Sequence, residues 1–164
     1  MKRIGISVIS AIIATTGLFL ANAPAYADGN TPICEAHGAW CIGAPSTSQN
    51  DPVVETAKGR TIDVKNVSGN TYIFVLIANT KLCVAADSAG TRTVLLPCSG
   101  SVGVNWVASK GPDNESCLFK NAHYGGYLSG NNNGTQFGVR GLNAAPGLRQ
   151  QFLTGQGVIG VCGS

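Results

Sequence analysis

Short apolar runs separated by polar and glycine clusters fill the chain after residue 27, and they predict strands. Thr71–Ile77 is rich in β-branched and aromatic residues, Ala78–Thr80 offers a turn, and Lys81–Val84 predicts the returning strand of a hairpin. Thr93–Leu96 predicts another strand, stopped by a proline, and Val102–Ala108 a further one. The pattern therefore indicates a protein built from short strands.

Signals for helices are nearly absent. No window after residue 27 repeats apolar residues at three- and four-residue spacing over three turns, and the 22 glycines of the sequence weaken any long helix. Clusters such as Ser46–Asn50, Ser99–Ser101 and Gly130–Gly134 favour turns between the strands. We therefore expect an all-β sandwich or barrel.

A threefold repeat favours the barrel. Similar stretches open at Ala39–Ile42, Lys81–Val84 and Gly125–Leu128, with Cys41, Cys83 and Tyr127 spaced by 42 and 44 residues. Each stretch is followed by a short apolar run: Pro52–Val54, Val94–Leu96 and Phe137–Val139. Each copy closes on a bulky apolar residue: Ile62, Trp106 and Phe152. A period of about 40 residues is typical of architectures in which each unit buries its apolar face against its neighbours.

The first 27 residues predict a secretory signal peptide. Lys2 and Arg3 precede the apolar stretch Ile4–Leu20, and Ala25–Ala27 forms a small-x-small cleavage signal. The alternative is an N-terminal membrane anchor, because the apolar stretch approaches the lower limit for spanning a bilayer. After cleavage, residues 28–164 would form one domain that is secreted and extracellular, with no membrane segment.

The charge of the chain gives no reason to expect a nucleic acid or an anionic membrane as partner. The whole sequence has 11 basic and 8 acidic residues, and removal of the first 27 residues lowers the net charge from +3 to about +1. The chain has no cluster of lysine and arginine that would attract phosphates.

The cysteines favour three disulfides. All six follow the predicted cleavage point: Cys34, Cys41, Cys83, Cys98, Cys117 and Cys162. An even number in an exported chain is typical of disulfides, although six cysteines allow 15 connectivities. A metal site is disfavoured because the sequence has no C-x-x-C and only two histidines, far apart.

The second copy resembles the ricin-type β-trefoil, a fold of secreted lectin modules. The resemblance lies in Lys81–Val84, Val94–Gly100 and Val104–Trp106, which are similar to a Cys-Leu-Asp-like start, a Pro-Cys-x-Gly middle and a Gln-x-Trp end. The first and third copies are similar in outline, so the resemblance covers about Ile33–Leu153. It implies an all-β trefoil of three pseudo-repeats of about 40 residues.

The resemblance also implies that Cys83 pairs with Cys98 and that Ile62, Trp106 and Phe152 meet in the core. The remaining pairs are not fixed by the family. Cys34 and Cys41 flank a turn and would bridge a hairpin, which would leave Cys117 with Cys162.

The sugar site of the family is degenerate in this chain. The family's carboxylate lies two residues beyond the opening cysteine, where this chain has Gly43, Ala85 and Ser129. Of the family's amides, only Gln150 remains before a closing aromatic. We expect a shallow, neutral site in the third copy, formed by these ligand-binding candidates: Tyr124, Ser129, Asn131, Asn132 and Gln150. The alternative is a solvated turn whose asparagines serve positive-φ positions.

No catalytic motif is present, so we expect a non-catalytic binding protein without cofactor or metal. Glycans are the leading ligand class by resemblance, with an extracellular protein as the other partner class, and we expect a monomer. The alternative function is a secreted protease inhibitor or protein-binding trefoil. Its candidate loop is Ala44–Pro52, which has a proline near each end that limits its freedom.

Overall fold

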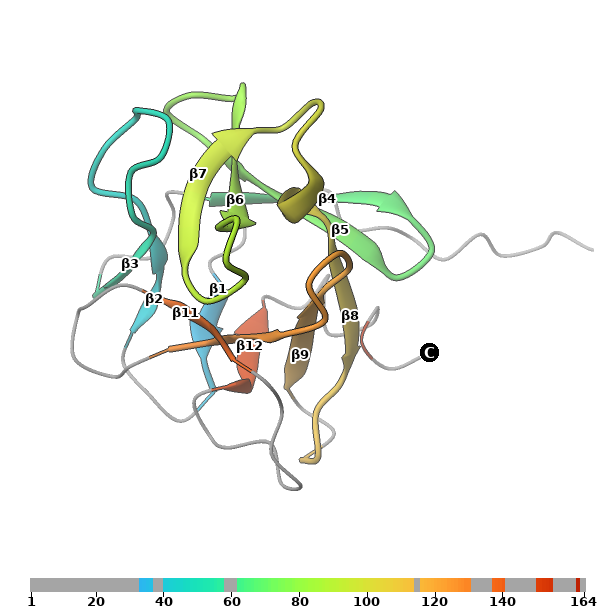
Figure 1. Cartoon of the computed structure of the whole chain (residues 1–164). Helices are drawn as coiled ribbons and strands as arrows, with labels where there is room; N and C mark the ends of the chain where they lie inside the picture. The colour runs from blue at the N-terminus through green and yellow to red at the C-terminus, as the bar shows by residue number, and fades with distance from the viewer. Residues whose placement is uncertain are drawn as a thin grey trace, which may run out of the picture.

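The computed structural model describes residues 33–36, 40–57, 62–113, 116–130, 137–140, 150–154 and 162. These residues form short strands and one 3-10 turn, η1 (Val102–Val104), as Figure 1 shows. The predicted signal peptide, residues 1–27, lies outside the described residues. Within the described residues, no helix is both long and apolar enough to span a membrane.

The described strands fall into three units of four. The first unit contains β1 (Ile33–Glu35), β2 (Cys41–Gly43), β3 (Val54–Thr56) and β4 (Ile62–Ser68). The second contains β5 (Thr71–Leu76), β6 (Leu82–Ala86), β7 (Thr93–Pro97) and β8 (Trp106–Lys110). The third contains β9 (Cys117–Asn121), β10 (Tyr127–Ser129), β11 (Gly138–Arg140) and β12 (Phe152–Thr154). The chain is therefore a β-trefoil, as predicted.

The three hairpins share one register, which confirms the internal triplication. In the β2–β3, β6–β7 and β10–β11 pairs, the opening residues Cys41, Cys83 and Tyr127 lie opposite Thr56, Leu96 and Arg140. The next positions along each strand, Ile42, Val84 and Leu128, are buried. The similar opening stretches in the sequence thus correspond to one hairpin that occurs in all three units.

Six strands form the barrel, and the three hairpins cap it. Antiparallel pairs link β1 to β12, β12 to β9, β9 to β8, β8 to β5 and β5 to β4. The blue β1 and the red β12 lie side by side in Figure 1, so the first and last strands meet in the barrel. The β1–β12, β9–β8 and β5–β4 pairs join strands of different units and make each unit depend on its neighbours.

A ring of backbone hydrogen bonds joins the three capping hairpins. The amide of Val53 donates to the carbonyl oxygen of Thr93 over 3.2 Å, Thr93 donates to Phe137 over 3.2 Å, and Phe137 donates to Val53 over 3.0 Å. Thr93 is the first residue of β7, and Val53 and Phe137 lie directly before β3 and β11. The ring satisfies three buried amides and orients the hairpins around one axis.

The closing residues of the three units meet in one core. Ile62, Trp106 and Phe152 begin β4, β8 and β12, are at most 1% exposed, and belong to the same hydrophobic cluster. A chain of rings connects the units: Phe74 stacks on Trp106 at 5.8 Å and meets Phe119 edge-on at 5.0 Å. The prediction that the closing residues pack in the core is confirmed.

One predicted strand is partly wrong. Residues 102–104 of the expected Val102–Ala108 strand form η1, and β8 begins only at Trp106. Gly103 explains the difference, because a Cβ at this position would lie 2.5 Å from the carbonyl oxygen of Ala86. The missing side chain lets η1 approach the backbone of β6, which the apolar pattern of the sequence does not reveal.

Three disulfides tie the trefoil. Cys83–Cys98 closes the β6–β7 hairpin, and Cys34–Cys41 joins the facing residues of β1 and β2. Cys117–Cys162 joins β9 to the C-terminal end of the chain across 45 residues. No free cysteine remains among the described residues.

Candidate functional site

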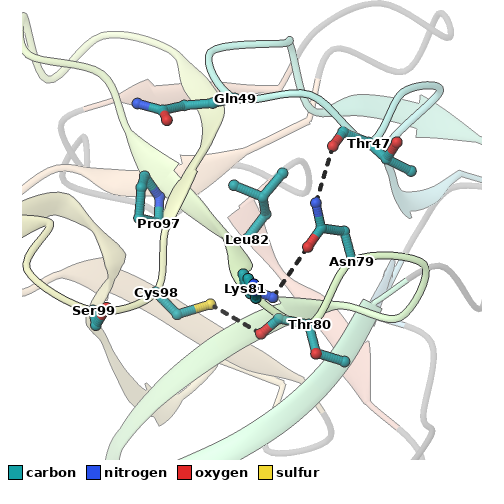
Figure 2. Close-up of a pocket in the computed structure, with 9 residues that line it drawn as sticks. All are labelled: Thr47, Gln49, Asn79, Thr80, Lys81, Leu82, Pro97, Cys98 and Ser99. Carbon is teal, nitrogen blue, oxygen red and sulfur yellow. Dashed lines mark hydrogen bonds between the residues drawn. The ribbon is translucent and has the colours of Figure 1, made fainter.

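A pocket of about 770 Å³ lies between the loop that follows β2 and the β6–β7 hairpin. We call it the loop–hairpin pocket. Its walls come from three segments: Thr47 and Gln49 of the loop, residues 79–82 at the β5–β6 turn and the first position of β6, and residues 97–99 at the end of β7 and directly after it. Figure 2 shows Leu82 in the middle, with Pro97 and Gln49 on one side and Thr47 and Asn79 on the other. The pocket therefore lies between the first and second units.

Asn79 connects two walls of this pocket. Its side-chain amide donates to the carbonyl oxygen of Thr47 over 3.2 Å, while its side-chain oxygen accepts from the amide of Lys81 at 3.3 Å (Figure 2). The carbonyl oxygen of Asn79 accepts from the amide of Leu82 at 2.9 Å, which closes the turn. A single turn residue thus orients the loop relative to the hairpin.

The loop is also held at its far end. The amide of Asn50 donates to the carbonyl oxygen of Leu95 over 2.7 Å, and the amide of Leu95 returns a bond to Asp51 over 2.9 Å. Asn50 has a φ of 68°, a conformation that asparagine tolerates better than most residues. The hydrogen bonds between Asn79 and Thr47 and between Asn50 and Leu95 therefore attach the loop to the second unit at two points.

The lining of the pocket combines apolar surface with polar groups and is almost neutral. Thr47, Gln49, Thr80 and Ser99 are exposed and contribute hydroxyl and amide groups, and Lys81 is the one charged residue among the lining residues. Leu82, Pro97 and Cys98 supply apolar surface. Such a mixture of apolar floor and convergent polar groups is typical of small-ligand sites.

The contact between Cys98 and Thr80 is not a hydrogen bond. The sulfur of Cys98 lies 3.9 Å from the carbonyl oxygen of Thr80 (Figure 2), but a disulfide sulfur has no proton to donate. The carbonyl oxygen of Thr80, which lies at the edge of the pocket, therefore accepts no hydrogen bond from this sulfur.

The residues predicted for a third-unit site are placed differently from one another. Ser129 is 4% exposed and donates its hydroxyl to the carbonyl oxygen of Gly130. Gln150 is 7% exposed, and Tyr124 is half-buried against the core. Asn131 and Asn132 lie outside the described residues. Burial leaves Ser129 and Gln150 little polar surface to offer a ligand, so Tyr124 is the one predicted site residue within the described part of the chain whose side chain is partly open.

Asn121 arranges the turn that carries Tyr124, a role that sequence reasoning missed. Asn121 is fully buried, and its side-chain amide donates to the carbonyl oxygen of Gly103 over 2.8 Å. Its side-chain oxygen accepts from the amides of His123 and Tyr124, each at 3.1 Å. The residue follows an apolar strand and precedes an Ala-His-Tyr turn, a position at which asparagine often bonds backbone amides two and three residues ahead.

Two buried carboxyl groups lie outside the pocket. Glu35 and Glu55 are each 3% exposed, and both carboxyl groups converge on Gly130: a Cβ there would overlap an oxygen of Glu35 and lie 2.7 Å from an oxygen of Glu55. A glycosidase needs its carboxyl pair beside an open substrate cleft. Both side chains are almost fully buried, and Glu55 also lines a smaller cavity of about 170 Å³.

Asp87 organises the turn between β6 and β7. One carboxylate oxygen accepts from the amides of Thr91 and Arg92 at 2.8 and 3.2 Å, and the other lies 3.3 Å from the Arg92 guanidinium. Partial burial alone would raise the pKa of Asp87, but these hydrogen bonds and the arginine charge outweigh it and lower the pKa. The described residues contain no group of three metal-binding side chains.

Comparison with known proteins supports the fold alone. No family model matches the chain, and no curated protein matches it. Solved structures of 20% identity or less are similar, among them a mosquitocidal holotoxin at a TM-score of 0.67, of which the chain covers 17% while 78% of this chain is matched.

Two smaller proteins show the range of functions on this fold. A Polyporus squamosus lectin bound to a human-type influenza-binding epitope is similar at 15% identity and a TM-score of 0.59, over 79% of this chain and 49% of the lectin. A proteinase inhibitor from Coprinopsis cinerea is similar at 14% identity and a TM-score of 0.58, over 78% of this chain and 97% of the inhibitor. The chain is thus similar in fold to toxins, lectins and inhibitors.

Proposed function

We propose that this protein is a non-catalytic, extracellular binding protein whose ligand is a glycan held in the loop–hairpin pocket. The observation that carries the proposal is the lining of that pocket. Hydroxyl and amide groups of Thr47, Gln49, Asn79 and Ser99 surround an apolar floor at Leu82 and Pro97. A sugar ring has the same two kinds of surface, hydroxyl groups around its rim and C–H groups on its faces.

Other features are consistent with this proposal. Three disulfides suit an oxidising compartment outside the cell. A Polyporus squamosus lectin that is similar in fold was solved with a glycan epitope bound. None of the pocket-lining residues is an acid or a histidine, the side chains that most often act as general acids and bases. We therefore propose that the pocket binds its ligand without turnover. The proposed protein is a monomer.

A glycan array with two matched variants tests the proposal. Thr47→Trp places a large ring at the pocket, and Thr91→Trp places the same ring at an exposed threonine of the β6–β7 turn outside the lining. The proposal predicts that the native protein and Thr91→Trp bind the same glycans and that Thr47→Trp loses them. Absence of binding to every glycan, or equal binding by both variants, would reject it.

The second candidate function is insertion of the Ala44–Pro52 loop into a protease cleft. Two observations favour it: the Asn79–Thr47 and Asn50–Leu95 hydrogen bonds hold the loop in one shape, and a proteinase inhibitor is similar in fold. A loop held in its bound shape loses less entropy on binding. Incubation with a panel of secreted proteases tests this function: inhibition that Gln49→Pro abolishes supports it, and inertness toward every protease rejects it.

A further inference from the structure

The loop–hairpin pocket contains one uncompensated positive charge. Lys81 is exposed directly before β6 and is the one charged residue that lines the pocket. No carboxylate lies on the pocket wall, and the described residues form no ion pair with Lys81. By contrast, Lys65 lies 3.9 Å from Asp63, and Arg92 lies 3.3 Å from Asp87. The ammonium group of Lys81 is therefore available to a ligand.

The charge is specific to this unit of the trefoil. In the sequence, Lys81 lies two residues before Cys83, and the residues two positions before Cys41 and Tyr127 are Ala39 and Gly125. Neither counterpart carries a charge. A cation is therefore not a requirement of the hairpin, which folds without one in two of its three copies.

The backbone of Lys81 is fixed on both sides. Its amide donates to the side-chain oxygen of Asn79 over 3.3 Å, and its carbonyl oxygen accepts from the amide of Cys98 at 2.9 Å. These bonds fix the α-carbon of Lys81 between Asn79 and Cys98. The flexible side chain leaves the ammonium group free to move. The arrangement presents a positive point charge among neutral hydroxyl and amide groups.

We propose that the pocket prefers saccharides that carry an anionic group, a carboxylate or a sulfate, over their neutral counterparts, and that Lys81 determines this preference. The inference rests on the proposed function, because it specifies the ligand class of the same pocket. A solvent-exposed ion pair of this kind changes affinity by about two- to five-fold at low salt. Salt weakens the effect because the Debye length falls to about 10 Å at 0.1 M.

Matched sugars and matched variants test the inference. Lactose, sialyllactose and a sulfated lactose are displayed on one array together with other neutral and acidic glycans, and binding is measured at low and high salt. Lys81→Gln removes the charge in the pocket. Lys110→Gln removes the same charge from an exposed residue at the end of β8, outside the pocket. The sialylated and sulfated arms distinguish the two sources of negative charge.

The inference predicts that the native protein and Lys110→Gln bind at least one acidic form about two- to five-fold more tightly than its neutral counterpart at low salt. Lys81→Gln would bind both forms alike, and Lys81→Glu would favour the neutral form. Equal affinities for neutral and acidic forms in the native protein would overturn the inference and leave the proposed function standing, as would a preference that survives Lys81→Gln. Absence of binding to every glycan would reject the proposed function and the inference together.

Discussion

The side-chain amide of Asn79 donates to the carbonyl oxygen of Thr47 over 3.2 Å, across 32 positions of the sequence. This bond joins the turn between β5 and β6 to the loop that follows β2, and so connects the first unit of the trefoil to the second. Both residues line the loop–hairpin pocket, and the shape of the pocket therefore depends on this contact.

Replacement of Asn79 by alanine should loosen the loop more than the fold. The variant loses the bonds to Thr47 and Lys81, and we expect the free energy of unfolding to fall by about 1–2 kcal/mol. Chemical denaturation measures this loss, and limited proteolysis should show faster cleavage within residues 45–50. Asn79→Asp, which keeps an acceptor for Lys81 but no donor for Thr47, should show the same faster cleavage. A loop as resistant as the native one in both variants would contradict the role of this bond.

Truncation of Trp106 should lower the free energy of unfolding more than truncation of the other closing residues, Ile62 and Phe152. Trp106 is fully buried, stacks on Phe74, and donates its indole N–H to the carbonyl oxygen of Val84 over 3.0 Å. Trp106→Ala should lower the free energy of unfolding by about 3–5 kcal/mol because it leaves a large cavity. Trp106→Phe keeps most of the ring surface and should cost less, chiefly the lost hydrogen bond. Equal losses for the two variants, measured by urea denaturation, would contradict this packing.

The three disulfides should differ in their contribution to stability. Sequence separations of 7, 15 and 45 residues predict losses of about 2, 3 and 4 kcal/mol when Cys34–Cys41, Cys83–Cys98 and Cys117–Cys162 are each replaced by two alanines. The order follows from the larger conformational entropy that a longer closed loop removes from the unfolded chain. Denaturant midpoints of the three double variants measure the order, and the reverse ranking would contradict it.

The carboxylate of Asp87 should make part of the stability depend on pH. Its hydrogen bonds to Thr91 and Arg92 lower the pKa in the folded state, so the folded protein binds a proton at this group less readily than the unfolded chain does. The contribution is therefore present above the unfolded pKa of about 3.9 and is lost as the pH falls through the folded value.

Asp87→Asn is the matched variant for this effect, because asparagine keeps an oxygen acceptor and does not titrate. Native protein should be more stable than the variant at neutral pH, and the difference should shrink as the pH falls below about 4. Urea midpoints between neutral and acid pH measure this difference. A difference that stays constant over the range would show that the charge of Asp87 has no part in the stability.

The fold was largely predictable from the sequence because the residues that define it recur. Ile62, Trp106 and Phe152 occur once in each copy, and the hairpin openings at Cys41, Cys83 and Tyr127 repeat at nearly constant spacing. A residue type that recurs at the same place in each copy indicates which position of each unit packs in the common core. The ring of backbone bonds among Val53, Thr93 and Phe137 was not predictable, since backbone groups leave no trace in residue types.

The candidate site was less predictable because it belongs to no single copy. Thr47, Asn79 and Pro97 come from two units, and each by itself is typical of an ordinary turn or strand end. Ser129 shows a related limit: a hydroxyl beside an amide-rich segment predicted a ligand-binding residue, and in the structure Ser129 pairs with Gly138 and is 4% exposed. Polar composition does not distinguish a buried position from an exposed one in a strand of three residues.

The most direct test of the account is to map the binding of the strongest array ligand on isotope-labelled protein by NMR. The proposed function predicts that the largest amide shift changes cluster at Thr47, Asn79, Lys81 and Ser99, around the loop–hairpin pocket. Changes centred instead on Tyr124 and Tyr127 of the third unit, or no changes at saturating glycan, would contradict it.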